Sequence, residues 1–168
     1  MPDSVCCLIK KLKVAQADLS LEKLFQIVRG SHLSIRSIED RIEYCKRNYK
    51  RNTLAAHAAF QILLICWKPG QFSQIHDHSG SRCVVKVLAG TAVETQYVDP
   101  DNAALTSTVR YSPGSVFGGE DGDIHVVGNP KSARTGLVTM HIYAPALTDM
   151  RLFEIDGGRL KEVVAAVS

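Results

Sequence analysis

After about residue 50 the sequence becomes a succession of short apolar or β-branched runs, and this pattern is the strongest constraint on the fold. The runs cover residues 62–67, 84–88, 91–97, 106–111, 137–143 and 152–155. Turn-forming residues separate them, among them Pro69-Gly70, Gly90, Pro113-Gly114 and Asn129-Pro130. Many short strands without alternating helices predict an all-β barrel or sandwich and argue against a parallel doubly wound sheet.

Helical periodicity occurs before residue 50. Between a potential cap at Ser20 and a potential end at Gly30, apolar residues repeat with helical spacing at Leu21, Leu24, Phe25 and Val28. A second helix is predicted behind Ser34 and should end before Asn48, because the same period recurs at Ile35, Ile38 and Ile42. We expect both helices to pack outside the sheet. Near the other end, Asp156-Gly157-Gly158 predicts a hairpin turn, and residues 160–167 fit a strand or a helix equally well.

Length and composition predict one domain, residues 1–168, with a helical segment over 1–48 and a β-barrel over 49–168. The net charge of +3 is too small to indicate a nucleic-acid partner. The longest weakly polar run, residues 54–67, is too short for a membrane span. No secretory signal pattern is present, and the five cysteines form no CxxC pair, so we expect a cytoplasmic protein with reduced thiols. A monomer is expected.

Two of the six histidines form the triplet His76-Asp77-His78. In a strand, residues two apart point to the same side, so both imidazoles would enter one space while Asp77 points away. This arrangement can clamp a metal ion. Two histidines on a surface strand would give the same pattern without binding a metal, so the triplet is weak evidence on its own.

The surrounding spacing is more specific. From Gly70 to Gly90, and again from Gly114 to Asn129, glycines and histidines keep a fixed register around His76, His78 and His125. In this register the sequence resembles the two motifs of the cupin superfamily, although Cys83 stands in place of the usual glutamate ligand and Glu120 in place of the usual proline. The resemblance implies a double-stranded β-helix, a small jelly-roll barrel, with these three histidines binding one metal inside it.

Three neutral imidazoles leave a divalent metal with its full charge and, if the metal is octahedral, up to three open positions. Such a centre could hold a bidentate substrate and dioxygen together. Imidazole also suits zinc, nickel and copper, so the ligands alone do not select iron. Without the motif, His125 would be interpreted as a core histidine bonded to a backbone carbonyl.

Within the cupins, residues 76–83 are similar to the metal motif of the cysteine dioxygenases, and the likeness extends to residues 49–52, 66–67 and 139–145. The resemblance implies non-haem Fe²⁺ as cofactor and the conversion of L-cysteine and O2 to cysteine sulfinic acid, a step of cysteine catabolism. It places Arg51 in the pocket with Tyr49 beside it. A guanidinium is suited to bidentate binding of a substrate carboxylate, although the neighbouring basic residues would otherwise indicate a solvated surface.

Thr139, His141 and Tyr143 are spaced by two in an apolar strand, so their side chains can form one hydrogen-bonded row. The row resembles the serine-histidine-tyrosine triad of the family, with threonine in the first place. The alternative is a core histidine satisfied by its neighbours. In animal members of the family, a cysteine at the position of Cys83 forms a thioether with the triad tyrosine, so a bond between Cys83 and Tyr143 is expected to be possible here.

The sequence therefore predicts a thiol dioxygenase whose partners are a small thiol and O2, with L-cysteine as substrate. The first alternative is another small thiol: 3-mercaptopropionate, or cysteamine, which Arg51 disfavours because cysteamine has no carboxylate. A cupin isomerase or hydrolase that uses zinc, nickel or manganese is a second alternative. The third is a non-catalytic cupin that binds a small ligand or senses redox state.

Overall fold

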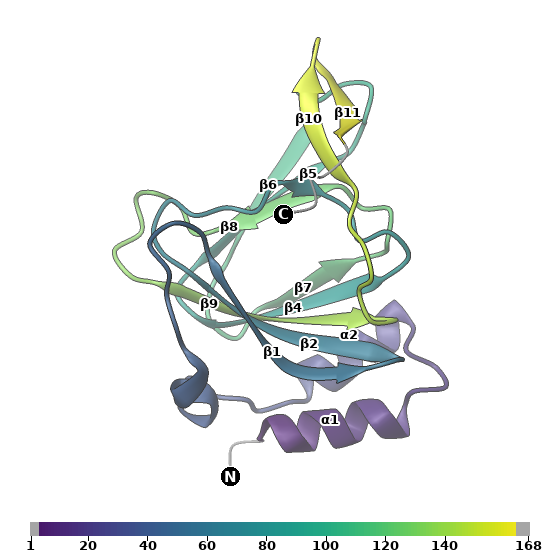
Figure 1. Cartoon of the computed structure of the whole chain (residues 1–168), viewed down its shortest axis with the longest axis vertical. Coiled ribbons are helices and arrows are strands. Elements are labelled where there is room, and N and C mark those ends of the chain that lie inside the picture. Colours follow the sequence, from purple (N-terminus) through teal and green to yellow (C-terminus); the bar gives the residue numbers. More distant parts are fainter. Residues whose placement is uncertain (1–3, 164–168) are drawn as a thin grey trace.

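The computed structural model describes residues 4–163. Figure 1 shows two antiparallel sheets that face one another as the halves of an open barrel, with the helices outside it. No helix within these residues is long and apolar enough to cross a membrane. The predicted all-β architecture with helices packed outside is confirmed.

The first sheet has the strand order β1-β2-β9-β4-β7. Its strands are β1 (Lys50–His57), β2 (Phe60–Trp67), β9 (Leu137–Ala144), β4 (Arg82–Ala89) and β7 (Val116–Gly119). Strand β9 lies at the centre, paired with β2 on one side and β4 on the other, and all eight of its residues are buried. A strand buried on both faces accounts for the nearly continuous apolar run in its sequence.

The second sheet has the order β11-β10-β3-β8-β5-β6. Its strands are β11 (Arg159–Val163), β10 (Leu152–Asp156), β3 (Ile75–His76), β8 (His125–Gly128), β5 (Ala92–Tyr97) and β6 (Thr106–Tyr111). The short strand β3 pairs with β8 through a single residue pair, His76 and His125. The sheet topology therefore brings the first and last histidines of the sequence motifs side by side.

The helices cover the outer face of the first sheet (Figure 1). Helix α1 (Val5–Val14) precedes α2 (Leu21–Arg29), whose first turn is capped because Ser20 Oγ accepts a hydrogen bond from the Lys23 amide at 3.4 Å. The apolar sides of both helices pack against alternate residues of the central strands, in a core formed by Leu8, Leu12, Leu24, Val28, Ile62, Val84, Met140 and Ile142.

The six predicted runs coincide with strands to within two residues at each end, and α2 has its predicted start and end. Three differences stand out. The second predicted helix is a single seven-residue 3₁₀ helix, η1 (Ile35–Arg41), because the apolar period spans too few residues to support several α turns. Helix α1 was not predicted. Residues 159–163 form the returning strand of the expected hairpin, and the rest of the undecided tail lies outside the described residues.

Candidate metal centre

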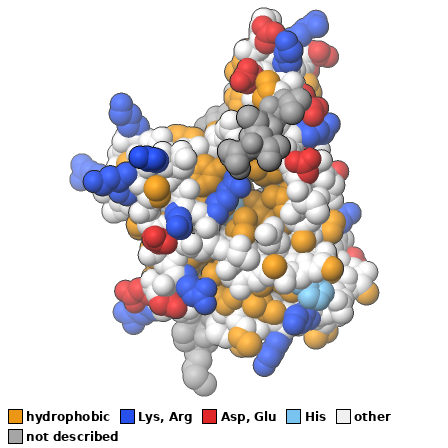
Figure 2. Space-filling view, viewed as in Figure 1, with side chains coloured by type: hydrophobic (Ala, Val, Ile, Leu, Met, Phe, Trp, Pro, Cys, Tyr) orange, Lys and Arg blue, Asp and Glu red, His pale blue; other side chains and the backbone are white. Residues whose placement is uncertain are grey.

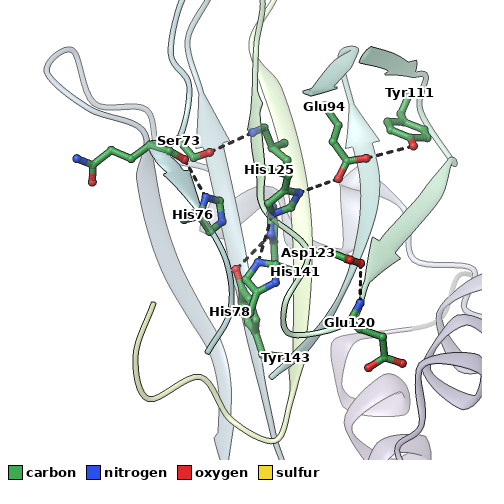
Figure 3. Close-up of polar contacts among 12 residues, drawn as sticks. Ser73, His76, His78, Glu94, Tyr111, Glu120, Asp123, His125, His141 and Tyr143 are labelled. Atoms are coloured by element: carbon green, nitrogen blue, oxygen red, sulfur yellow. Dashed lines mark hydrogen bonds and ion pairs between the residues drawn. The ribbon is translucent and has the colours of Figure 1, made fainter. Parts of the chain in front are cut away.

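Three buried histidines meet between the two sheets (Figure 3). One candidate ligand atom from each of His76, His78 and His125 lies within 4.8 Å of the other two. The Nε2 atoms of His78 and His125 are 3.3 Å apart. Among residues 4–163 this is the single cluster of three or more potential side-chain ligands of this kind. The structure thus brings together the three histidines that the sequence motifs select.

The expected strand geometry of the triplet is only partly correct. Strand β3 ends at His76, and His78 lies beyond it in a segment that reverses at Ser79 (φ 39°) and Gly80 (φ 97°). Asp77 is completely buried and forms an ion pair with Arg151, whose Nε lies 2.7 Å from Oδ2. The ion pair holds the histidine segment against the start of β10.

The outer nitrogen atoms of the three rings have different partners. His76 Nδ1 lies 2.8 Å from the carbonyl oxygen of Gln74, and His125 Nδ1 lies 2.7 Å from Oε1 of Glu94. These acceptors favour protonation at Nδ1, which leaves the Nε2 lone pair for a metal. His78 Nδ1 is buried without a hydrogen-bond partner in the described residues. Two facing Nε2 atoms and a third imidazole beside them are chemically suited to one divalent cation.

The environment keeps His76 and His78 in the neutral, ligand-competent form. Burial, reinforced by the neighbouring imidazole of His125, lowers the pKa of His76 to about 4. The same two causes lower the pKa of His78 to about 2. At neutral pH neither imidazole therefore has to lose a proton before it binds a metal.

Beside the histidines lies a narrow inner cavity of about 20 Å³, whose lining includes Tyr49, Arg51, His141, Tyr143 and Met150. A wider, open cavity of about 570 Å³ adjoins it and shares Arg51 and Met150 with the inner one. Figure 2 shows hydrophobic and basic side chains at the opening between the two sheets. A small molecule can thus approach the histidines past Arg51.

Arg51 and Tyr49 lie together on this path. Arg51 Nη2 donates a hydrogen bond to the Tyr49 hydroxyl at 2.7 Å, and the Tyr49 ring packs on Trp67 with 4.2 Å between centroids. Arg51 lies on the edge strand β1, Tyr49 directly precedes that strand, and both side chains line the inner cavity. The guanidinium is thus held beside the cavity and keeps further N–H donors for an anionic group.

The three polar residues of β9 form the expected row. Thr139 Oγ1 lies 2.9 Å from His141 Nε2, and His141 Nδ1 lies 3.4 Å from the Tyr143 hydroxyl. Trp67 Nε1, which is only a donor, contacts Thr139 Oγ1 at 2.9 Å. The threonine hydroxyl can then donate its own proton to His141 Nε2, which leaves the imidazole proton on Nδ1, facing Tyr143. Burial lowers the pKa of His141 to about 3 and raises the pKa of Tyr143.

Cys83 on β4 is directly opposite Tyr143 on β9. The cysteine is buried, which raises the pKa of its thiol, and the nearby phenol of Tyr143 partly offsets this rise. The pairing across neighbouring strands places the two side chains next to each other. It does not by itself form a covalent bond.

Sequence reasoning missed two polar residues at this site. Glu94 is buried and contacts His125, and the Tyr111 hydroxyl lies 3.2 Å from the other carboxylate oxygen of Glu94. The available signal was a glutamate inside the apolar run 91–97, since a carboxylate in a buried strand needs a partner.

The fold and the three-histidine cluster define a metal-binding cupin. The chain superposes on a Klebsiella pneumoniae protein with a double-stranded β-helix domain, with TM-score 0.60, 17% identity and coverage of 70% of this chain and 95% of that one. It also superposes on an RmlC-like cupin protein from Desulfovibrio desulfuricans, with TM-score 0.51, 18% identity and coverage of 62% and 90%.

The sequence narrows this class further. Residues 14–156 match the family Cysteine dioxygenase type I, and the chain belongs to this dioxygenase family. It is 24% identical over 168 aligned residues to cysteine dioxygenase type 1 of Bos taurus, covering 88% of this chain and 83% of that protein. Identity to the Danio rerio protein of the same name is 25% over 156 residues, covering 80% and 77%.

Proposed function

We propose that the protein is an Fe²⁺-dependent cysteine dioxygenase that converts L-cysteine and O2 to cysteine sulfinic acid. The observation that supports this function most strongly is a cluster of three histidines beside a single cavity that Arg51 and Tyr143 line. The reaction balances as R–SH + O2 → R–SO2H, so both oxygen atoms enter the product and no further reductant is needed. It stops at the sulfinic level of cysteine oxidation.

His76, His78 and His125 would hold the iron through their Nε2 atoms. Bound there, Fe²⁺ would supply the redox chemistry and lower the pKa of the substrate thiol. Because all three ligands are neutral, the anionic groups of the substrate meet no negatively charged ligand. The burial of the histidines, which are at most 7% exposed, limits the access of water to the reacting atoms.

Arg51 would bind the substrate carboxylate with its free N–H groups while its Nη2 stays on Tyr49. Fixing the carboxylate at one end and the thiol at the other determines the orientation of the substrate. A thiol without a carboxylate would lose this interaction. Cysteamine should therefore be a poor substrate, and the comparison of cysteine with 3-mercaptopropionate tests the contribution of the amine.

Tyr143 would be the catalytic phenol. With the His141 proton on Nδ1 and directed at the Tyr143 oxygen, the phenol would donate its own proton into the cavity, toward the substrate or O2. Thr139 acts through His141 by fixing its tautomer. The raised pKa of Tyr143 keeps the phenol protonated and able to donate at neutral pH.

We further propose a thioether between Cys83 Sγ and the ring of Tyr143. One hydrogen leaves the thiol and one leaves the ring, and O2 is the oxidant that takes them up. The contact between the two side chains across β4 and β9 supports this bond. Active protein should contain a population lighter by two hydrogens in intact-mass spectra, and this population should be absent from a Cys83→Ser variant. An unchanged mass after many turnovers would contradict the bond.

The decisive experiment measures O2 consumption by Fe²⁺-loaded protein with L-cysteine, 3-mercaptopropionate and cysteamine, and identifies each product by mass. We expect cysteine sulfinic acid, with the highest kcat/KM for cysteine. Arg51→Gln should raise the KM for cysteine at least about tenfold, since a charge-assisted hydrogen bond contributes about 1.5–3 kcal/mol. No O2 uptake with any thiol while iron is bound would refute the proposed activity.

The working form that we propose is a cytoplasmic monomer in which residues 1–168 act as one domain. Sedimentation of the iron-loaded protein tests the oligomeric state directly. A concentration-independent mass of one chain is the expected result.

A further inference from the structure

A buried carboxylate contacts one of the three histidines. Glu94 on β5 is 3% exposed, and its Oε1 lies 2.7 Å from His125 Nδ1 on the neighbouring strand β8. On its other side, the Tyr111 hydroxyl of β6 donates to Oε2 at 3.2 Å. Figure 3 shows the resulting line from Tyr111 through Glu94 to His125.

Packing and strand pairing hold the side chains of Tyr111, Glu94 and His125 in place. The Tyr111 ring stacks on Phe117 with 4.0 Å between centroids and 6° between planes, which fixes the hydroxyl. Strand β5 lies between β8 and β6 in the second sheet, so backbone pairing sets the spacing of all three polar residues. The arrangement is rigid because it depends on neighbouring strands instead of a loop.

Within residues 4–163, no lysine or arginine forms an ion pair with Glu94. The other buried carboxylate near the histidines, Asp77, is paired with Arg151. In the part of the chain that the structure describes, the one ion-pair partner of Glu94 is His125. A buried carboxylate without a cation is costly, and the cost is reduced when a nearby positive charge compensates it.

We propose that Glu94, held by Tyr111, is a positioning residue of the metal centre that orients His125 and supplies a compensating negative charge. Its acceptor oxygen keeps the proton of His125 on Nδ1 and directs the Nε2 lone pair at the metal. The carboxylate also increases the basicity of this one imidazole. The outer nitrogen of His76 faces a neutral carbonyl oxygen, and that of His78 has no partner in the described residues. Among the three histidines, a carboxylate therefore supports only His125.

This inference rests on the metal site of the proposed function and not on thiol oxidation. The test uses apoprotein and Co²⁺ or Zn²⁺, with a chromophoric chelator as competitor. Glu94→Gln keeps the size and an acceptor oxygen but removes the charge, whereas Glu94→Ala removes both. Tyr111→Phe removes only the hydroxyl. Glu154→Gln, an exposed carboxylate on β10, is the matched control.

We expect Glu94→Ala to weaken metal binding 10–100-fold, the usual effect of removing a ligand's hydrogen-bond partner. Glu94→Gln should lose less metal affinity than Glu94→Ala, because glutamine still orients His125 although it lacks the charge. Tyr111→Phe should lose the least affinity. The visible spectrum of the Co²⁺ form should shift in both Glu94 variants. Glu154→Gln should match the wild type in affinity and spectrum.

The inference would be overturned if Glu94→Gln and Tyr111→Phe bound metal with wild-type affinity and gave an unchanged Co²⁺ spectrum. This test remains valid even if Glu94→Ala fails to fold. If the wild type binds metal and oxidises cysteine while these variants bind equally well, only the role of Glu94 is wrong. If the wild type binds no divalent metal, the proposed function fails with it.

Discussion

At the residue scale, the hydroxyl of Thr139 connects Trp67 to His141. Thr139→Val preserves the shape of the side chain but leaves a buried indole N–H and an imidazole nitrogen without partners. Each unsatisfied group costs about 1–3 kcal/mol, so we expect the free energy of unfolding to fall by at least this amount and kcat to fall with it. Urea unfolding and O2 uptake measure the two effects.

Thr139→Ser is the matched control, because serine keeps the hydroxyl and loses only a methyl group. It should retain kcat and cost about 1 kcal/mol. Equal losses in both variants would show that packing of the methyl group, and not the hydrogen-bonded row, is responsible.

His141 makes stability depend on pH. Burial lowers its pKa from 6.5 in the unfolded chain to about 3 in the folded protein. Between these values the unfolded state binds more protons, so the free energy of unfolding should fall as pH decreases from 6.5 toward 3. Urea unfolding of the apoprotein at pH 7 and pH 4.5 measures this loss. His141→Gln, which does not titrate, should lose less over the same range; an identical loss would contradict the assignment.

The sequence predicts site residues to different degrees. His76 and His78 were identifiable because they belong to one short motif, and the row on β9 was identifiable because strand residues alternate in direction. Glu94 was not identifiable in this way. Its contact with His125 depends on the pairing of β5 with β8, two strands separated by the β6–β7 region of the chain. Local periodicity carries no information about such pairing.

At the scale of elements, β7 can lie against β4 only because residue 118 is glycine. A Cβ atom at Gly118 would lie 2.1 Å from the carbonyl oxygen of Cys83. Gly118→Ala should therefore push β7 away from β4 and lower the free energy of unfolding by about 1–3 kcal/mol, as overpacking usually does. Thermal unfolding measures the effect.

Gly122 provides the control, since nothing lies within 4 Å of a Cβ atom there. Gly122→Ala should leave the melting temperature nearly unchanged. Equal destabilisation by the two substitutions would mean that the close approach of β7 to β4 is not the cause.

Most strands with a clear run of apolar or β-branched residues were predicted, whereas short or polar strands were missed. Strand β1 has a polar, mostly half-exposed sequence because it is an edge strand. Strands β3, β7 and β8 have only two to four residues, too few to show a period. Their existence follows from pairing with longer neighbours, which is a tertiary effect.

For the whole molecule, metal binding should stabilise the fold, because the three ligands come together only in the folded chain. At a free metal concentration about 100 times the Kd, the gain is about 2.7 kcal/mol. For a domain of this size, that corresponds to a rise in Tm of roughly 5–10 °C. His78→Ala should abolish most of the rise, and a chelator should reverse it in the wild type. A rise of equal size in His78→Ala would place the bound metal elsewhere.

Strand β9 carries two sets of residues that are under different selection, one for the chemistry of the site and one for the stability of the core. Thr139, His141 and Tyr143 alternate with Val138, Met140 and Ile142, and the latter three pack in the helix-covered core. Substitutions at one set should alter chemistry while the fold survives, whereas substitutions at the other set should alter expression and solubility. New activities can therefore evolve on this scaffold by changing every second residue of a single strand, and a saturation library over residues 138–143 should show fitness effects with a period of two.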